Sequence, residues 1–249
     1  MKRVKLVVAY DGTNYCGWQV QKNGETIESV LNRAIGELTG EEIHVMGSSR
    51  TDAGVHACGN VAVFDTEARM TADKFSYALN QRLPEDIRIQ DSCEVPADFH
   101  PRFQKTVKTY EYRILNREFP LPAYRFNSHF TYRKLDVERM RQAAAYLIGE
   151  HDFQSFCAAG AQVKTTVRTI YALDVEKQGD LIILRITGNG FLYNMVRIIA
   201  GTLMKIGQGD WEPECIPEIL AGCDRQLAGP TAPARGLTLM EIHFKGEKG

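Results

Sequence analysis

The segment with the clearest chemical potential is residues 47–57, which read GSSRTDAGVHA. Arg50 and Asp52 lie two residues apart in it, and only small side chains stand next to the aspartate. Glycine and small polar residues interrupt the surrounding strand pattern, so we expect a loop at the protein surface. A carboxylate presented in this way can act as a nucleophile or stabilise positive charge on a substrate.

The same pair also fits a purely structural interpretation, in which Arg50 and Asp52 close a turn. An exposed ion pair contributes only ~0–1 kcal/mol to stability. So small a gain in stability does not explain why the loop has such a specialised composition. The loop composition therefore favours Asp52 as an acid that faces a substrate.

Positive charge interleaved with aromatic side chains follows between residues 101 and 117. Against the single acid Glu111, the basic residues of this run are Arg102, Lys105, Lys108, Arg113 and Arg117. Cations contact phosphates and aromatic rings stack on bases, so the run predicts an RNA-binding strip. The alternative is a solvated strand face without a ligand. A second cluster, Arg125, Arg133 and Lys134, would extend the strip.

Tyr110 and Tyr112 belong to a predicted strand over residues 107–115. Residues two apart in a strand share one face, so the two rings point the same way. Either tyrosine could stack on a base, and either could instead pack within the sheet. The residues alone leave both alternatives open.

A second loop, residues 11–17, is rich in glycine and precedes Trp18. It fits a cradle for an RNA phosphate or support for the active site, and it fits equally well a tight turn with a packed tryptophan. His56 and His100 are expected to support neighbouring groups by hydrogen bonds rather than to act as acid–base catalysts.

The sequence indicates neither a metal nor a cofactor. Its six cysteines form no C-x-x-C pair, and its six histidines show no H-x-x-x-H or H-E-x-x-H spacing, which are the usual signs of zinc sites. There is no G-x-G-x-x-G or Walker loop for a nucleotide. We therefore expect reduced thiols and a reaction that needs no metal or small-molecule cofactor.

The composition is that of a soluble protein, 44% apolar and 24% charged. No apolar run approaches the ~18 residues of a membrane helix, and the short apolar stretch after the basic start makes a poor signal peptide. We expect a cytoplasmic protein without membrane contact. A net charge of −1 and a pI of about 6.6 require any RNA contact to come from local basic patches.

The predicted elements that must position these residues repeat one order. The first half reads as a strand at 4–10, a helix at 26–38, strands at 43–46 and 60–64, a helix between 71 and 84, and a strand at 87–95. The second half reads as a strand at 107–115, a helix at 136–148, strands at 168–176 and 181–186, helices at 191–206 and 213–221, and a strand at 237–244.

Two β-α-β-β-α-β units predict an α+β fold of two ferredoxin-like halves, residues 1–104 and 105–249. Each half is expected to hold a largely antiparallel sheet with helices on one face. The first half carries the aspartate loop. A catalytic cleft between the halves is the expected substrate site.

Several motifs, in order along the chain, resemble those of the tRNA pseudouridine synthase A family. RTDAGVHA at residues 50–57 matches its R-T-D-A-G-V-H signature, and YDGTNYCGWQ at residues 10–19 is similar to its opening motif. Four further segments resemble later motifs of the family: DFHPRF at 98–103, YEY at 110–112, DFQSF at 152–156 and MVR at 195–197. The resemblance spans nearly the whole chain.

This resemblance implies that Asp52 is the catalytic nucleophile and that Arg197 lies beside its carboxylate. It implies that Arg50 helps to hold the flipped base and the RNA backbone, and that Tyr110 rather than Tyr112 packs on the target uracil. It further implies a homodimer that isomerises uridines 38, 39 and 40 in the anticodon stem-loop of tRNA.

The implied reaction suits these residue types. Making pseudouridine breaks the C1′–N1 bond of uridine and forms a C1′–C5 bond, so no redox cofactor or group donor is needed. Positive character develops at C1′, which a carboxylate can stabilise or trap. The uracil remains bound and attacks again, so one carboxylate suffices. Whether Asp52 attacks C1′, acts at C2′ or adds to the base is left open.

Two other classes of protein fit part of the pattern. A non-catalytic RNA-binding module on ferredoxin-like units would display aromatic stackers, but it does not explain the loop of Arg50 and Asp52. A metal-free small-molecule hydrolase would need a second carboxylate or a Ser/His pair near Asp52. The full series of motifs favours the synthase.

Overall fold

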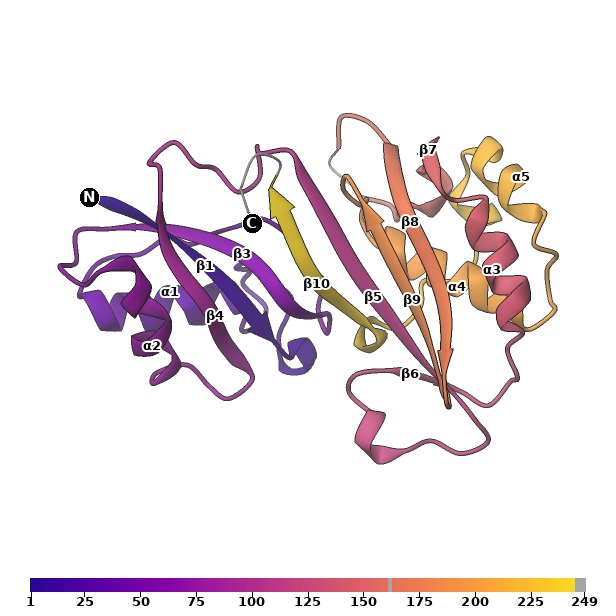
Figure 1. Cartoon of the computed structure of the whole chain (residues 1–249), viewed down its shortest axis with the longest axis horizontal. Coiled ribbons are helices and arrows are strands. Elements are labelled where there is room, and N and C mark those ends of the chain that lie inside the picture. The colour runs from indigo at the N-terminus through magenta and orange to yellow at the C-terminus, as the bar shows by residue number, and fades with distance from the viewer. Residues whose placement is uncertain (161–162, 245–249) are drawn as a thin grey trace. The chain divides into compact units, whose positions relative to one another are not determined.

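The computed structural model describes residues 1–160 and 163–244. They form two compact units, one from Met1–Lys105 with the described part of Leu239–Gly249 and one from the described part of Thr106–Thr238 (Figure 1). The first unit begins with β1 (Lys2–Tyr10), α1 (Ile27–Thr39), β2 (Met46–Gly47), β3 (His56–Thr66), α2 (Phe75–Asn80) and β4 (Ile87–Val95). The chain continues with β5 (Thr106–Asn116), β6 (His129–Thr131), α3 (Val137–Ala145), β7 (Gly149–Asp152), β8 (Val167–Gln178), β9 (Leu181–Gly188), α4 (Met195–Gly207), α5 (Cys215–Gly222) and β10 (Leu237–Phe244).

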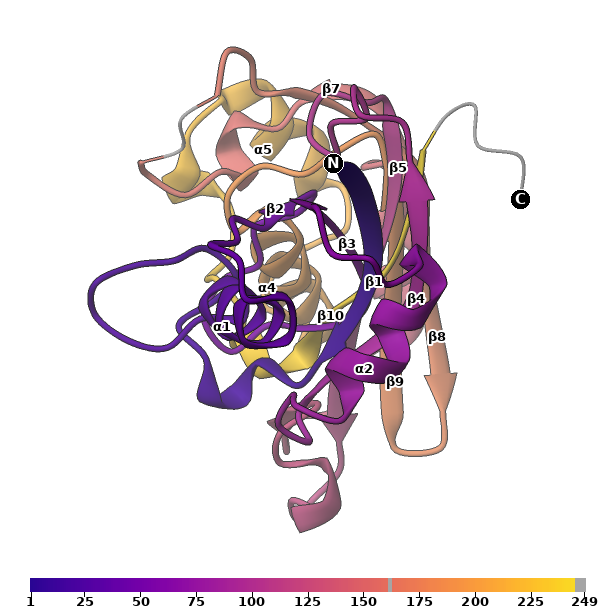
Figure 2. The ribbon, with the colours of Figure 1, turned by 90° about the vertical axis from the view of Figure 1, so that its left-hand side faces the viewer.

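The first unit has the predicted β-α-β-β-α-β order around an antiparallel sheet. Its strands lie in the order β4-β1-β3, and β2 also pairs with β3. In β1, Val4, Leu6 and Val8 are fully buried while the residues between them stay partly exposed. This alternation marks a sheet that is covered more completely on one face. Figure 2 shows α1 almost end-on to one side of β1 and β4.

Helix α1 begins and ends where the sequence predicts. Thr26 accepts a hydrogen bond from the Ser29 N–H, and the Ser29 hydroxyl accepts one from the Thr26 N–H, which closes a capping box. Gly40 ends the helix with a left-handed φ of 75°, a conformation that glycine adopts without steric cost. Leu31 and Ile35 on the inner face are fully buried.

The strands beside the aspartate loop differ from the prediction over residues 43–46 and 60–64. Strand β2 is only Met46–Gly47, because Ile43 and Val45 are buried outside the sheet and the Val45 N–H donates to Asn32 of α1. Strand β3 begins at His56, so the end of the predicted loop is strand. Periodicity misses this because β3 is buried on both faces over much of its length.

The second unit contains an antiparallel sheet with the strand order β5-β9-β8-β7. Strands β8 and β9 match the strands predicted at 168–176 and 181–186. They form a hairpin whose turn includes Gly179 with a φ of 60°. The short strands β6 and β7 are additions that the sequence pattern does not reveal, and β6 pairs in parallel with β5. In Figure 2, α4 and α5 lie to one side of β5 and β8.

Two helices of the second unit are shorter than predicted. Helix α3 starts after the N-cap Asp136, as expected, but ends at Ala145 rather than at residue 148. Helix α4 begins at Met195 rather than at residue 191, because Asn194 has a left-handed φ of 59° that interrupts the helical backbone. Both helices present buried apolar residues such as Met140 and Leu203.

The last strand departs from the expected division into residues 1–104 and 105–249. Most of β10 belongs to the first unit, where it lies next to β3. The Phe244 ring packs edge-on against Phe99, with centroids 5.2 Å apart, and the Met240 carbonyl lies close to Gly59. The chain therefore returns to its first unit at the end, which an order of elements along the sequence cannot reveal.

Candidate active site

Asp52 opens a tight turn that leads into β3. The Val55 N–H donates to the Asp52 carbonyl at 3.1 Å, and Gly54 takes a left-handed φ of 77°. Asp52 is half-buried, its neighbour Thr51 is buried and Ala53 is exposed. The turn thus holds the backbone of the aspartate firmly while leaving part of the residue at the surface.

The opening motif of the chain packs directly against this turn. The backbone N–H of Trp18 donates to the Thr51 carbonyl at 3.0 Å, and the hydroxyls of Tyr10 and Thr51 are 2.7 Å apart. Gly17 has a φ of 85°, and a Cβ atom there would lie 2.7 Å from the Thr51 carbonyl oxygen. Only glycine fits this close approach. Residues far apart in sequence therefore build one support beneath Asp52.

Asn60 in β3 ties down the chain on the other side of Arg50. Its Nδ2 donates to the Ser49 carbonyl at 3.0 Å and to the Tyr10 hydroxyl at 3.3 Å, and its Oδ1 accepts from the Ser49 N–H at 3.3 Å. Asn60 is fully buried. Sequence reasoning overlooked this residue, although a polar side chain inside an apolar strand was the available signal.

His56 links the turn to the first loop. Its Nδ1 lies 3.1 Å from the Gly12 nitrogen and 3.0 Å from Asp11 Oδ1. Nδ1 accepts from the Gly12 N–H when it carries no hydrogen and donates to Asp11 when it carries one. Burial alone would raise the pKa of Asp11, but hydrogen bonds from Thr13 and the nearby His56 outweigh it and lower that pKa.

The glycine-rich loop at residues 11–17 is a packed turn in this structure. Trp18 is fully buried, and its ring centroid lies 5.9 Å from that of Tyr10. The Tyr15 hydroxyl donates to Asp86 at 2.6 Å, and burial together with that carboxylate raises the pKa of Tyr15. The observed contacts match a tight turn with a packed tryptophan, and the approach of Gly17 and Trp18 to Thr51 also matches support for the aspartate turn.

The two arginines expected near the RNA lie on neighbouring loops of the first unit. Arg50 and Arg102 are both exposed. The Arg102 Nε donates to the Gly47 carbonyl at 2.8 Å, and the Ser48 hydroxyl donates to the Pro101 carbonyl at 2.9 Å. Loss of hydration, followed by the like charge of Arg50, lowers the pKa of Arg102. Lys105, further along the same loop, is exposed.

The two candidate tyrosines in β5 have different surroundings. Tyr112 is fully buried, and its hydroxyl donates to the Pro233 carbonyl at 2.9 Å. Burial raises the pKa of Tyr112. Tyr110 retains 9% exposure and meets Phe191 edge-on with centroids 5.3 Å apart. The ring of Tyr112 is therefore committed to the core.

Arg197 lies in the first turn of α4 and is oriented by its own unit. Its Nε donates to the Ala232 carbonyl at 2.7 Å, and one terminal nitrogen donates to Asn194 Oδ1 at 2.8 Å. The Ala232 N–H in turn donates to the Arg197 carbonyl at 3.0 Å. The two hydrogen bonds that the Arg197 guanidinium donates, to Ala232 and Asn194, fix the orientation of this planar group.

Part of the predicted positive run is neutralised within the second unit. The buried Glu111 pairs with Arg113 at 2.7 Å and with Arg185 at 2.9 Å. Arg117 lies 3.4 Å from Asp180. Lys108 is half-buried in β5. The run thus offers fewer unpaired cations than its sequence suggests.

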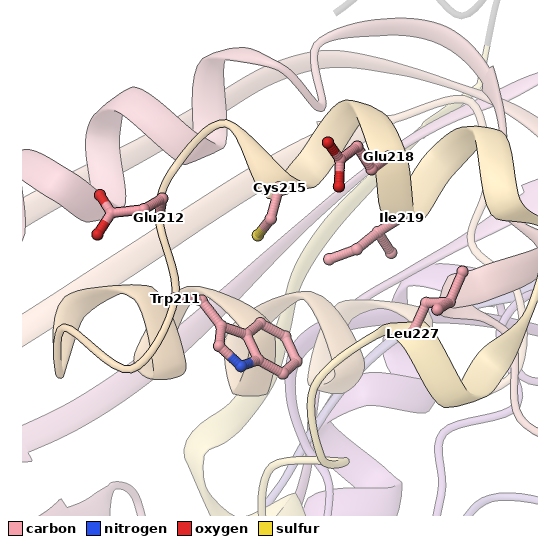
Figure 3. Close-up of a pocket in the computed structure, with 6 residues that line it drawn as sticks. All are labelled: Trp211, Glu212, Cys215, Glu218, Ile219 and Leu227. Atoms are coloured by element: carbon pink, nitrogen blue, oxygen red, sulfur yellow. The ribbon is translucent and has the colours of Figure 1, made fainter.

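A separate pocket of about 310 Å³ lies in the second unit (Figure 3). Its lining comes from α5 and adjacent turns and consists of Trp211, Glu212, Cys215, Glu218, Ile219 and Leu227. None of these is a predicted site residue. Within residues 1–160 and 163–244, no three His, Cys, Asp or Glu side chains are grouped to hold a metal ion. In the same ranges, no helix has the length and apolar character needed to cross a membrane.

The amino-acid sequence matches that of a known protein family. A family model described as tRNA pseudouridine synthase matches residues 6–104 and 143–245. The chain belongs to the tRNA pseudouridine synthase family. Asp52 and Arg197 lie inside the matched ranges of this family, whereas Lys108 and Tyr110 lie between them.

Several curated members of this family resemble the chain over almost its full length. The tRNA pseudouridine synthase A of Brevibacillus brevis is 51% identical over 245 residues, covering 98% of this chain and 100% of the relative. Those of Ruminiclostridium cellulolyticum and Acetivibrio thermocellus are 49% and 48% identical, each covering 98% of this chain and 100% of the relative.

Among solved structures, the archaeal box H/ACA sRNP Nop10-Cbf5 complex has 10% identity and a TM-score of 0.34. That match covers 95% of this chain and 46% of the other chain, so the chain spans less than half of that protein. A likeness this weak supports no further conclusion.

Proposed function

We propose that the protein isomerises uridine to pseudouridine in the anticodon stem-loop of tRNA, at positions 38, 39 and 40. The observation that carries the proposal is Asp52, half-buried in a turn that buried groups hold in place, within the motif that resembles the family's signature. The membership of the family and the names of the relatives support the reaction class and the tRNA substrate.

Asp52 acts as the catalytic carboxylate. The C1′–N1 bond breaks with both electrons going to uracil, and the carboxylate assists by stabilising or trapping C1′, by acting at C2′ or by adding to the base. The uracil turns within the site, C5 forms the new bond to C1′, the C5 proton leaves and N1 gains a proton. Every atom is retained, so the chemistry is complete with one carboxylate and without a cofactor.

Arg197 and Tyr110 act on the same uridine as Asp52. Arg197 has an orientation set by Asn194 and the Ala232 carbonyl, which suits a cation that must face a carboxylate without reorganisation. Tyr110 packs on the target uracil, and the core position of Tyr112 supports this choice. Such stacking offsets part of the few kcal/mol that flipping a base costs.

Basic side chains hold the RNA backbone around the flipped base. Arg50 and Arg102 are exposed beside the Asp52 turn, and Lys105 and Lys108 extend the charge along the chain. Contacts of this kind release counterions, so tRNA affinity should fall as salt is raised. We propose further that the enzyme works as a homodimer in the cytoplasm, as the family resemblance implies.

The direct test is Asp52→Asn, which removes the charge and keeps the size of the side chain. Release of tritium from C5-labelled uridine in tRNA should fall more than a hundredfold, whereas tRNA affinity measured by titration should change little. Asp91→Asn, at an exposed position of β4 in the same unit, is the matched control and should retain full turnover.

Turnover of Asp52→Asn at a tenth of the wild-type rate would remove Asp52 as the nucleophile. Wild-type protein that binds tRNA and releases no tritium would instead favour a non-catalytic RNA-binding module.

A further inference from the structure

In the second unit a long connection, residues 117–134, joins β5 to α3, and we name it the β6 lobe. Figure 1 shows the lobe as a loop with a short helical turn. The loop leaves the end of β5 and extends beyond it. It lies between the two ranges that the family model matches. Connections of this length without extended regular structure are uncommon and often functional.

The β6 lobe displays large aromatic side chains to solvent. Phe119 is 67% exposed, Tyr132 73% and Phe126 45%. Five of its 18 residues are aromatic, against 9% for the whole chain. Keeping so much apolar surface in water disfavours the free protein, which points to a ligand that covers it.

The charge of the lobe indicates which ligand that is. It contains four basic residues and one acidic residue. Arg117 and Arg133 pair with Asp180 and Asp210 outside the lobe, so Arg125 and Lys134, both exposed, supply the positive charge that a ligand can meet. The Arg125 guanidinium lies 4.1 Å from the centre of the Phe126 ring, so a cation and an aromatic face are presented together. Exposed rings among cations are the features that bind unpaired bases and their phosphates.

The lobe is fixed at its base rather than loosely attached. The Asn116 Nδ2 donates to the carbonyls of Thr131 and Arg133 at 3.1 and 2.8 Å, and its Oδ1 accepts from the Leu135 N–H at 3.1 Å. Strand β6 pairs with the end of β5, and Arg133 forms a close ion pair with Asp210 at 2.8 Å. A scaffold ordered in advance reduces the entropy lost when its side chains bind.

We propose that the β6 lobe is a second tRNA-binding surface, at which Phe119 and Tyr132 stack on unpaired bases while Arg125 and Lys134 contact phosphates. This inference rests on tRNA being the substrate, and it assigns residues outside the proposed catalytic set. The ligand of the lobe is RNA rather than an apolar protein face, because the neighbouring cations favour a polyanion.

The test compares the double variant Phe119→Ala/Tyr132→Ala with wild-type protein by titration with two probes, full-length tRNA and a fully paired RNA duplex. The affinity for tRNA should fall at least tenfold, because two stacking faces are lost. The affinity for the duplex, which offers no unpaired base, should stay within twofold. Phe119→Tyr/Tyr132→Phe keeps both rings and should bind tRNA like the wild type.

Tyr77→Ala is the matched control, because Tyr77 is 70% exposed on α2 and also has a cation over its ring, Lys74 at 5.5 Å. It should leave tRNA affinity unchanged, and all variants should melt at the wild-type temperature. An equal loss of affinity for tRNA in the Tyr77 variant, or an unchanged affinity in the double variant, would overturn the proposal.

Two further outcomes separate the lobe from the catalytic proposal. Loss of tRNA affinity in the double variant, with a wild-type protein that makes no pseudouridine, would support the lobe and reject the catalytic function. A double variant that changes the sedimentation of the protein but not its tRNA affinity would identify the lobe as a protein–protein contact and reject RNA binding there.

Discussion

At the scale of single residues, the site of the first unit depends on buried polar groups that hydrogen-bond to one another. Tyr10, Thr51 and Asn60 form one hydrogen-bonded group beneath the turn of Asp52. None of them is expected to touch the substrate. Their role is to keep the backbone on both sides of Arg50 and Asp52 in one conformation, which catalysis by a fixed charge requires.

Asn60 offers a sharp test of this positioning role. Asn60→Ala removes two buried hydrogen bonds, those of Asn60 to the Ser49 carbonyl and N–H, and removing one partner of a buried hydrogen bond costs about 1–3 kcal/mol. We expect kcat to fall at least tenfold with KM changed less than threefold, because the turn loosens without loss of RNA contacts. Steady-state kinetics on tRNA, with thermal unfolding in parallel, measures both.

Asn80 provides the control, because it makes a similar pair of bonds to Ile89 at 2.8 Å in a different part of the same unit. Asn80→Ala should lower stability comparably and leave kcat unchanged. If both variants lower kcat equally, the effect is one of general stability and Asn60 has no positioning role.

At the scale of elements, the sequence predicts most of the helices and strands. The strand over residues 4–10, the helix over 26–38 and the strands over 168–176 and 181–186 rest on local signals, and each appears in the structure as β1, α1, β8 and β9. The signals fail where burial overrides pattern. Residues 43–45 have the apolar character of a strand but are buried outside the sheet. Strand β3 begins before the predicted residue 60, and the pattern misses this because both faces of the strand are buried.

The candidate site divides in the same way. Asp52 and Arg50 are identified by their motif, and the loop that carries them is recognised from its small residues. The network of Asn60, Tyr10 and Thr51 is not predictable, because it joins residues from separate strands and loops. Period-2 alternation treats Tyr110 and Tyr112 alike, and only the resemblance to the family selects Tyr110. The hydrogen bond of Tyr112 to Pro233 supports that proposal.

Helix α1 yields a prediction at this scale. Thr26→Ala removes both the side-chain acceptor and the capping box, and should lower the free energy of unfolding by about 1 kcal/mol. For a protein of this size the melting temperature should drop by roughly 2–4 °C. Calorimetry should find Thr26→Ser close to wild type, because the hydroxyl is retained.

Thr71 serves as the reference, since it precedes the next helical turn without a capping hydrogen bond. A drop for Thr71→Ala as large as that for Thr26→Ala would contradict the assignment of the stabilisation to the cap.

At the scale of the whole molecule, both units contribute residues to the proposed chemistry. Asp52 and Arg50 belong to the first unit, whereas Tyr110, Arg197 and the β6 lobe belong to the second. The net charge of −1 leaves RNA binding to local groups of cations. Recognition of the tRNA therefore depends on where these groups lie rather than on the overall charge.

The most direct measurement is a map of pseudouridines in the tRNA of cells that lack this protein, complemented with wild-type protein or Asp52→Asn at equal levels. We predict that pseudouridine disappears from positions 38, 39 and 40, returns with the wild-type protein and stays absent with Asp52→Asn. Pseudouridine retained at these positions in the deletion, or restored by Asp52→Asn, would contradict an enzyme that works through this carboxylate.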